Sequence, residues 1–354
     1  MIHFHCDYQE GCAPEILARL QATNMEQTIG YGQDPYSQEA KALIAKLCGI
    51  DTEQGERLWR EKDTAGSVHL LVGGTQTNTL VINALLRPHQ GVIAADSGHI
   101  NVHETGAIEH CGHKVMAQAT SDGKLTAAQV QDVILSHLYD PNIEHMVQPG
   151  MVYISFPTET GMLYTKQELT ALSAICRQYE LPLYIDGARL GYGLMAPAAD
   201  ITLRELAALA DVMYIGGTKQ GALFGEALVV CNPKYRKDLR YLIKQSGGML
   251  AKGRLIGIQF LTLMQNDLYW QLAAKAVRQA LNIRQALLDK GYRMASESPT
   301  NQQFVIIADD KLNELKTRYL FDYCERVDEA HSMVRICTSW ATRDEDVTQL
   351  IHDL

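Results

Sequence analysis

The chain lacks the features that mark several common classes of protein. None of its apolar runs approaches the length of a membrane span, and its first residues do not resemble a signal peptide. Its eight cysteines contain no Cys-x-x-Cys pair, which favours reduced thiols over a disulfide framework or a zinc site. Basic residues are outnumbered, and the net charge of −9 argues against nucleic acid as the main partner. These absences predict a soluble, cytoplasmic protein that binds neither a membrane nor a nucleic acid.

Motifs for other common chemistries are also missing. The Gly-Gly-Thr-Gln sequence at residues 73–76 matches neither the G-x-x-x-x-G-K-[ST] nor the G-x-G-x-x-G pattern of nucleotide sites. His99 and His103 are spaced by about one helical turn, yet no H-E-x-x-H sequence accompanies them. We therefore predict no metal site, and a nucleotide-binding oxidoreductase is only a remote alternative.

Apolar runs of strand length alternate with helical patterns through the middle of the chain. The expected strands are residues 68–72, 91–96, 151–156, 184–186, 212–219 and 226–231, and the expected helices include 77–86 and 166–179. Strands that alternate with helices are typical of a mainly parallel sheet with helices on its faces. The sequence therefore predicts an α/β fold for this region.

The order of elements changes after a glycine-containing break at residues 245–248. The later part is expected to hold a helical stretch at 252–290, strands near 303–308 and 333–337, and helices around 311–318 and from 344 onward. For 354 residues two unequal domains are expected. We predict an N-terminal segment (1–25) that packs on the small domain, a large cofactor-binding domain (26–249) and a small α+β domain (250–354).

Two chemically useful residues stand at the ends of consecutive expected strands. Asp186 ends one strand and Lys219, 33 residues later, ends the next. Parallel strands joined by a crossover bring their carboxyl ends to one edge of a sheet, where ligands of such folds bind. A pyridoxal phosphate (PLP) enzyme needs a lysine for the Schiff base and an acid for the pyridine nitrogen. Each residue alone could be an ordinary turn residue, but the pair favours PLP.

Other expected strand ends carry further candidates. The helix that begins after residues 73–76 offers free N–H groups to a phosphate. His99 could stack on a cofactor ring or act as a base, whereas Glu159 is either a turn residue or an acid over the pocket. Arg335 lies inside an apolar stretch, where its partner is either a structural carboxylate or that of a substrate.

These residues together resemble those of the L-threonine aldolases, a branch of the β-eliminating lyases within fold type I of the PLP enzymes. The resemblance covers nearly the whole chain. Residues 73–78 resemble the phosphate-binding turn of that family, and 98–106 its cofactor-stacking histidine segment. The Asp-Gly-Ala-Arg sequence at 186–189 and the segment ending in Lys219 match its signature and its Schiff-base lysine. Residues 30–35 resemble its early tyrosine loop, and Val334-Arg335 its substrate-binding arginine.

The resemblance implies a fold and a set of roles. The fold is that of the PLP-dependent transferases of type I, with a mainly parallel mixed sheet covered by helices and a smaller C-terminal α+β domain. The implied cofactor-binding residues are Gly74, Thr75, Gln76, His99, Asp186, Arg189, Thr218 and Lys219. The implied substrate-binding residues are Cys6, Tyr31, Glu159, Arg189 and Arg335. The implied catalytic residues are Lys219, His99, Asp186 and Glu159.

The implied reaction is aldol cleavage of a small L-β-hydroxy-α-amino acid, of threonine or allo-threonine type, to glycine and an aldehyde. Either Glu159 or His99 would take the proton of the β-hydroxyl. A β-eliminating lyase or an aminotransferase would use the same lysine and aspartate and is the main alternative. A non-enzymatic binding module would have little use for that pair.

The family also implies a homodimer or homotetramer with shared active sites. Tyr31, Lys244, Lys252 and Arg254 are the candidates to act across its interface.

Two departures from the family pattern concern the substrate. The sequence His5-Cys6-Asp7 stands where the family often has Arg-Ser-Asp, so a thiol replaces a hydroxyl donor. Thr158-Glu159-Thr160-Gly161 stands where some members have Thr-His-x-Gly. We therefore expect the substrate to vary more than the cofactor.

Overall fold

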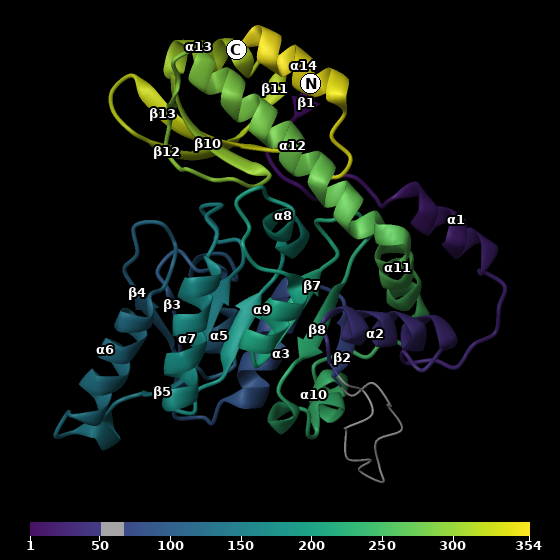
Figure 1. Cartoon of the computed structure of the whole chain (residues 1–354), viewed down its shortest axis with the longest axis vertical. Coiled ribbons are helices and arrows are strands. Elements are labelled where there is room, and N and C mark those ends of the chain that lie inside the picture. The colour runs from purple at the N-terminus through teal and green to yellow at the C-terminus, as the bar shows by residue number, and fades with distance from the viewer. Residues whose placement is uncertain (51–66) are drawn as a thin grey trace.

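The computed structural model describes residues 1–50 and 67–354. Figure 1 shows a larger body built around one sheet, a smaller body above it that holds both chain termini, and a long helix, α12, that runs from one to the other. Within the described ranges, no helix has the length and apolar character that crossing a membrane requires.

The larger body is built on a seven-stranded sheet in the order β2-β8-β7-β6-β5-β3-β4. The strands are β2 (Val68–Leu71), β3 (Gln90–Ala95), β4 (Val115–Gln118), β5 (Gln148–Ser155), β6 (Leu183–Asp186), β7 (Val212–Gly216) and β8 (Glu226–Val230). The pairs β3/β4, β3/β5, β5/β6 and β6/β7 are parallel, whereas β8 runs antiparallel to both of its neighbours. The predicted mainly parallel, mixed sheet is therefore confirmed.

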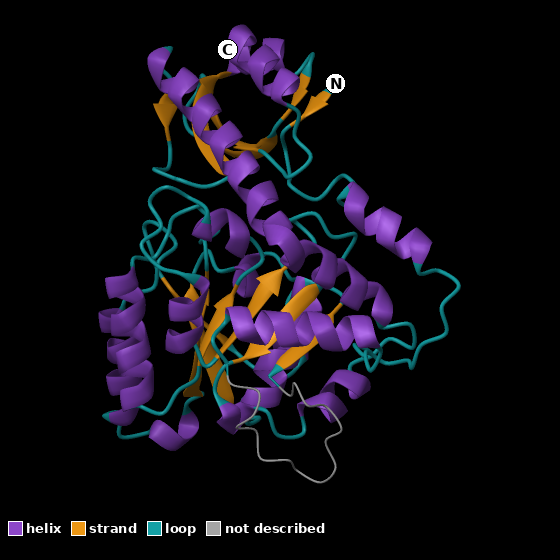
Figure 2. Cartoon of the chain, turned by 45° about the vertical axis from the view of Figure 1, so that its right-hand side comes forward, coloured by secondary structure: helices purple, strands orange, loops and turns teal. Residues whose placement is uncertain are grey.

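Helices cover both faces of this sheet (Figure 2). They are α2 (Pro35–Leu47), α3 (Gly74–Leu85), α4 (His99–Val102), α5 (Ala107–His110), α6 (Ala127–Leu138), α7 (Lys166–Gln178), α8 (Leu190–Leu194), α9 (Leu203–Leu209), α10 (Leu239–Gln245) and α11 (Arg254–Met264), with 3₁₀ turns η1 (Ile143–His145) and η2 (Pro233–Tyr235). One apolar cluster joins the sheet to α2, α6, α7, α9 and α11, and a second joins it to α3, α5 and α10. Strands β6, β7 and β8 are buried throughout because they are covered on both faces.

Local sequence explains where several of these helices begin. Thr126, Thr165 and Thr202 each form a capping box with a Gln or Glu three residues later, at the starts of α6, α7 and α9. Asp34 caps α2 through the Ser37 N–H and is followed by proline at the first helical position.

The smaller body has a four-stranded antiparallel sheet in the order β12-β13-β10-β9. Its elements are β9 (Arg293–Met294), β10 (Gln302–Ala308), β12 (Asp322–Arg326), β13 (His331–Cys337), α12 (Leu268–Asp289), α13 (Asp309–Leu315) and α14 (Asp344–Asp353). The N-terminal strand β1 (Ile2–His3) pairs in parallel with β11 (Tyr319–Leu320), and Phe4 joins the apolar core of this body. The first residues of the chain therefore belong to the smaller body, together with its C-terminal part.

Helix α11, which falls in the predicted small domain, contacts helices near the start of the chain. It packs against α2 and against α1 (Pro14–Ala22), and α12 then leads to the small sheet. The domain limits 1–25, 26–249 and 250–354 stay a prediction.

Two sequence-based boundaries need correction. The helical stretch predicted at 252–290 is broken by η3 (Gln265–Asp267), because Asn266 and Asp267 adopt left-handed φ angles of 54° and 59°. The strand predicted at 212–219 ends at Gly216, since the Gly217 and Thr218 N–H groups bond to the Gly225 carbonyl in a turn. Lys219 therefore lies three residues beyond the strand.

Candidate active site

Strand direction gathers the predicted groups at one edge of the large sheet. Asp186 ends β6, and His99, Glu159 and Lys219 follow β3, β5 and β7 within a few residues. Strands β6 and β7 are adjacent and parallel, as the sequence predicts for Asp186 and Lys219. Because β8 is antiparallel, its first residue, Glu226, starts at this same edge.

The Asp186 carboxylate is buried and accepts four hydrogen bonds. Oδ2 accepts from Tyr153 Oη at 2.7 Å and Asn78 Nδ2 at 3.0 Å, and Oδ1 accepts from the Ala188 N–H at 3.0 Å and from Tyr214 Oη. Burial alone would raise the pKa of Asp186, but the His99 ring and the tyrosine donors outweigh it and lower that pKa. Asp186 is therefore held as a carboxylate at neutral pH.

A second buried carboxylate orients His99. Glu104 Oε1 lies 2.8 Å from His99 Nδ1 and accepts from Asn78 Nδ2 at 2.7 Å. A carboxylate at Nδ1 favours the tautomer with its proton there, which leaves Nε2 as the basic nitrogen. The imidazole is about one-third exposed, at 31% of its side-chain area, so Nε2 is accessible to a ligand.

The Lys219 amine has no ion pair and no hydrogen bond among the described residues, and lies 5.8 Å from the centre of the Tyr8 ring. Burial lowers the pKa of Lys219, and the nearby Arg189 guanidinium lowers it further. Asp7, Asp186 and Glu226 oppose this shift without cancelling it. A lysine with a depressed pKa is a better nucleophile than a solvated one.

Arg189 forms a two-pronged ion pair with Asp7. Nε donates to Oδ2 at 2.7 Å and Nη2 to Oδ1 at 3.0 Å. Asn301 Nδ2 adds a third donor to the fully buried Asp7 at 2.9 Å. Burial opposes ionisation of Asp7, but Arg189 outweighs it and lowers the pKa to about 2. This pair ties the N-terminal segment to the large body and to the loop before β10.

The first turn of α3 is arranged for an anion. Gly73 provides no side-chain cap, so no side chain caps the amides of Gly74, Thr75 and Gln76. A Cβ at Gly73 would meet nothing within 4 Å, so the approach to this turn is open. Thr75 is exposed, whereas Gln76 accepts from the Val72 N–H at 3.3 Å.

The Glu159 carboxylate is fixed by hydrogen bonds from neighbouring groups of the protein. Its Oε1 accepts from Ser155 Oγ at 2.6 Å and from the His99 N–H at 2.9 Å. Burial raises the pKa of Glu159, although the Ser155 hydrogen bond opposes the shift. Glu159 therefore fixes the backbone of His99 as well as being a candidate acid.

Arg335 lies on β13 of the small sheet with three partners. Nη1 donates to Gln302 Oε1 at 2.9 Å, and Nη2 donates to the His5 carbonyl at 3.1 Å and pairs with Asp322 at 2.7 Å. Nε is buried without a partner in the described part of the chain. Cys6 is half-buried next to the bonded His5 carbonyl, and burial raises the pKa of its thiol.

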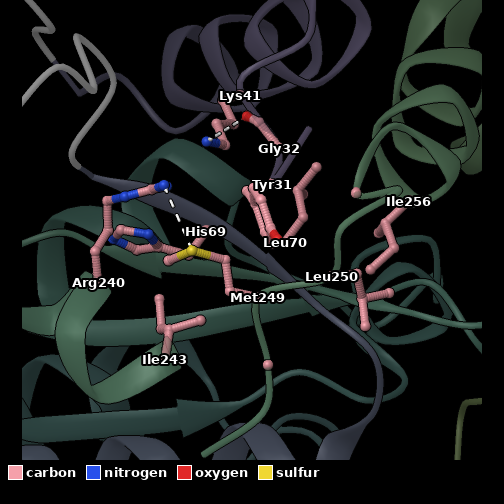
Figure 3. Close-up of a pocket in the computed structure, with 12 residues that line it drawn as sticks. Tyr31, Gly32, Lys41, His69, Leu70, Arg240, Ile243, Met249, Leu250 and Ile256 are labelled. Atoms are coloured by element: carbon pink, nitrogen blue, oxygen red, sulfur yellow. Dashed lines mark hydrogen bonds between the residues drawn. The ribbon is translucent and has the colours of Figure 1, made fainter. Parts of the chain in front are cut away.

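Tyr31 lies away from this constellation, in a separate small cavity (Figure 3). Its ring is 4.6 Å from Lys244 Nζ, and its φ angle is 59°. The predicted cofactor-binding and catalytic residues do not line this cavity. Of the other interface candidates, Arg254 donates to the Glu26 and Asn24 carbonyls, and Lys252 is exposed.

Several neighbours of these groups were not among the predicted site residues. They are Asp7, Tyr8, Asn78, Glu104, Tyr153, Tyr214 and Glu226. A repeated pattern could have found two of them, since Tyr-Ile occurs just before the ends of β5, β6 and β7. Alternation along a strand places tyrosines at equivalent positions on one face, and Tyr153 and Tyr214 donate to Asp186 from there. The sequence suggests an ordinary polar helix position for His103, but the centre of its ring lies 5.5 Å from the centre of the His99 ring.

Comparisons with known proteins agree with this geometry. Residues 4–310 match the family model described as "Beta-eliminating lyase". A low specificity L-threonine aldolase from Pseudomonas aeruginosa is 28% identical, covering 99% of this chain and 96% of the relative.

Solved structures with the same fold include two informative cases. A threonine aldolase from Leishmania major has 39% sequence identity and a TM-score of 0.92, covering 99% of this chain and 98% of that one. An aspartate aminotransferase from Thermus thermophilus has 15% identity and a TM-score of 0.71 over 100% and 90% of the two chains, a likeness of fold alone. The predicted fold of the type I PLP enzymes is therefore confirmed.

Proposed function

The chain belongs to the beta-eliminating lyase family, and from this premise we propose that it is a PLP-dependent aldolase. Its substrate would be a small L-β-hydroxy-α-amino acid of threonine or allo-threonine type, and its products glycine and an aldehyde. The observation that carries the proposal is the pair at one edge of the adjacent strands β6 and β7, an ionised, buried Asp186 and a half-buried Lys219 of depressed pKa. The aldolase relative that covers 99% of the chain supports the choice of reaction.

The residues present fit PLP. Lys219 offers an amine without a bonded partner in the described chain, and α3 offers uncapped amides to a phosphate. Asp186 offers a carboxylate that can keep a pyridine nitrogen protonated. When bound, the cofactor supplies an electron sink for the bond broken at Cα. We propose Gly74, Thr75, Gln76 and Thr218 for the phosphate, with Arg189 bordering the ring.

The substrate carboxylate would bind at Arg335, with Cys6 beside it. The guanidinium is held by Gln302, the His5 carbonyl and Asp322, while Nε keeps a hydrogen that no described residue accepts. A fork-shaped donor suits a carboxylate. Arg189 is less suited to this task because its two-pronged partner Asp7 is fully buried, whereas Asp322, which pairs with Arg335, is 45% exposed.

His99 is better placed than Glu159 to accept the β-hydroxyl proton. Glu104 engages His99 Nδ1, so Nε2 can act as the base on the open side. Glu159 is half-buried, and its Oε1 already accepts two hydrogen bonds. We propose that His99 takes the proton and that Glu159 holds the His99 backbone in position.

The experiment that tests the proposal is the near-visible absorption spectrum of the purified protein before and after borohydride. A yellow protein that bleaches, with the label mapped to Lys219, is the expected result. L-threonine should then yield glycine and acetaldehyde. Release of ammonia or an oxo acid would replace the aldolase by a β-eliminating lyase or an aminotransferase, and a colourless protein that takes up no PLP would overturn the proposal.

We propose a homodimer or homotetramer in the cytoplasm. Exposed apolar side chains support the assembly, since Met25, Ile29 and Tyr241 are 88%, 70% and 69% exposed near the Tyr31 cavity. All eight cysteines are unpaired, as a reducing compartment favours.

If Tyr31 serves the partner's site, mixing subunits of inactive K219A and inactive Y31A should restore activity that neither has alone. No recovery after verified subunit exchange would contradict shared sites.

A further inference from the structure

Glu226 is a buried carboxyl group to which the proposed reaction gives no role. It is the first residue of β8 and is only 4% exposed. Its backbone pairs with Gly216 of β7 and Leu71 of β2, the strands that precede Lys219 and the α3 turn. Glu226 therefore stands between the two segments proposed to hold the cofactor's amine-reactive end and its phosphate.

The side chain of Glu226 lies on the face of the sheet that α3 covers. Leu228 and Val230, at alternate positions along β8, belong to the cluster formed with α3 and Tyr214. Alternation along a strand puts Glu226 on that same face. Strand β8 also packs directly on α3, whose uncapped first turn is close to Tyr214 at Gly74.

Two donors from the turn before Lys219 bind this carboxyl group. Thr218 Oγ1 donates to Glu226 Oε1 at 2.8 Å, and the Gly217 N–H donates to Oε2 at 3.0 Å. The Gly225 N–H in turn donates to Thr218 Oγ1 at 3.0 Å. A hydroxyl group has one hydrogen and two lone pairs, so an ionised Glu226 uses the only hydrogen that Thr218 can offer. The other acceptor near that hydroxyl, the Gly225 carbonyl, is 3.5 Å away, at the limit of a hydrogen bond.

Protonation of Glu226 would reverse this hydrogen bond without moving any heavy atom. A proton on Oε1 can donate to the free lone pair of Thr218 Oγ1, which still accepts from the Gly225 N–H. The Thr218 hydrogen is then released and can point to a third group. When Glu226 is ionised, in contrast, its negative charge faces the phosphate site and the Thr218 hydroxyl has no hydrogen left to donate.

We propose that Glu226 is a positioning residue whose proton decides whether Thr218 can donate to the phosphate of the cofactor held at the α3 N-terminus. The neutral acid is the state that accompanies a bound phosphate, and the carboxylate is the state that opposes it. This inference rests on the proposed function, since the phosphate is that of PLP.

The charges around Glu226 allow both states near neutral pH. Burial raises the pKa of Glu226 to about 7, although the bonds from Thr218 and Gly217 and the charge of Lys219 oppose the shift. Asp186 on β6 raises it, and a phosphate dianion would raise it further. Helix α3 carries no ionisable side chain. His69 of β2 lies opposite Leu228, and Tyr153 of β5, Tyr184 of β6 and Tyr214 of β7 belong to the cluster on this face. The charge of Glu226 also acts on Tyr269 of α12, and burial raises the pKa of each of these tyrosines.

Infrared spectroscopy of the holoenzyme reads the Glu226 proton directly. We expect a C=O band of a protonated carboxyl in the wild type that shifts in D₂O, is absent in E226Q, and titrates at a lower pH once PLP is removed. E144Q, which changes an exposed glutamate, is the matched control and should leave the band unchanged. T218V should shift the band, because the hydroxyl partner is lost while Glu226 remains. This variant also serves if E226Q does not fold.

The affinity for PLP supplies a second readout. Relative to E226Q, the wild type should lose up to about tenfold in affinity per pH unit between the pKa of Glu226 in the free protein and its higher pKa in the bound state, because one proton is taken up on binding in that interval. Normal borohydride labelling of Lys219 with no Glu226 band in the holoenzyme, and equal pH slopes in wild type and E226Q, would overturn this inference alone. Loss of labelling at Lys219 would instead overturn the proposed function together with it.

Discussion

Two charged groups of the candidate site, the Asp186 carboxylate and the Arg335 guanidinium, differ in how completely they and their neighbours are paired. On the side of Asp186, both carboxylate oxygens are occupied by donors from β5, β7, α3 and the backbone, all within the larger body. On the side of Arg335, three buried nitrogens lack a partner among the described residues, namely Arg335 Nε, Gln302 Nε2 and His5 Nδ1.

This difference separates a carboxylate whose partners are complete from a guanidinium whose partners are not. Donors that are fixed before a ligand arrives need no reorganisation, so the Asp186 side is suited to a permanent cofactor. Unpaired donors are costly to bury, so the Arg335 side is suited to a group that supplies the missing acceptors when it binds. That side is assembled from β13, the loop before β10 and the N-terminal segment. The substrate end therefore depends on segments that are far apart in the chain.

The largest expected effect is on the cofactor side. Replacing Lys219 with alanine (K219A) removes the only amine proposed to attach PLP, and activity should fall by on the order of 10³-fold or more. The borohydride label should vanish while the far-ultraviolet circular dichroism stays unchanged. Lys237, which is exposed, gives the matched control K237A with normal activity. A label that persists in K219A would place the attachment elsewhere.

A slightly smaller loss is expected for D186N. An amide is neutral and can accept at only one atom, so one of the buried tyrosine hydroxyls loses its acceptor. We expect kcat to fall by roughly 10² to 10³, as for other fixed electrostatic partners, with the label on Lys219 retained. D132N, at an exposed position of α6, is the control. Normal kcat in D186N would show that the network is structural only.

The stability that the Asp7–Arg189 ion pair contributes should depend on pH. Asp7 has its pKa lowered to about 2, because Arg189 outweighs the burial that opposes it. Its ionised pair therefore contributes stability above the unfolded pKa, near 3.9, and loses it as pH falls toward about 2. D7N should lower the free energy of unfolding by about 3 kcal/mol at neutral pH.

Thermal unfolding midpoints between neutral pH and about pH 3 measure this effect, because that interval spans the unfolded carboxyl pKa. The gap between wild type and D7N should narrow with acid, whereas D310N, an exposed change on α13, should stay close to wild type. A gap of constant size would mean that Asp7 acts through packing rather than charge.

The smallest of these effects belongs to the substrate side. R335K keeps a positive charge but loses the fork, and a charged hydrogen bond contributes about 1.5–3 kcal/mol, which corresponds to roughly a 10- to 150-fold rise in KM. The absorption spectrum of the bound cofactor should not change. R278K, on the exposed surface of α12, is the control. An altered spectrum with normal KM would reverse the distinction between the two sides.

Local patterns predicted the elements of the fold well. The expected strands at 68–72, 91–96 and 226–231 lie within one or two residues of β2, β3 and β8, and the expected helix at 166–179 ends one residue beyond α7. Apolar periodicity and capping residues are written in consecutive positions, so they can be read without the structure. The η3 break was missed because left-handed φ angles at Asn266 and Asp267 leave no mark in that periodicity.

The sequence by itself determined that Lys219 and Asp186 follow consecutive strands of an α/β sheet, and that their residue types suit PLP. Only the tertiary structure decided which groups surround them. Asp7 meets Arg189 across 182 positions of the chain, and Asn78 meets Asp186 across 108. The antiparallel direction of β8 brings Glu226 to the same edge. Such contacts depend on strand order and direction, which arise from packing the whole chain and are not encoded in any local stretch of it.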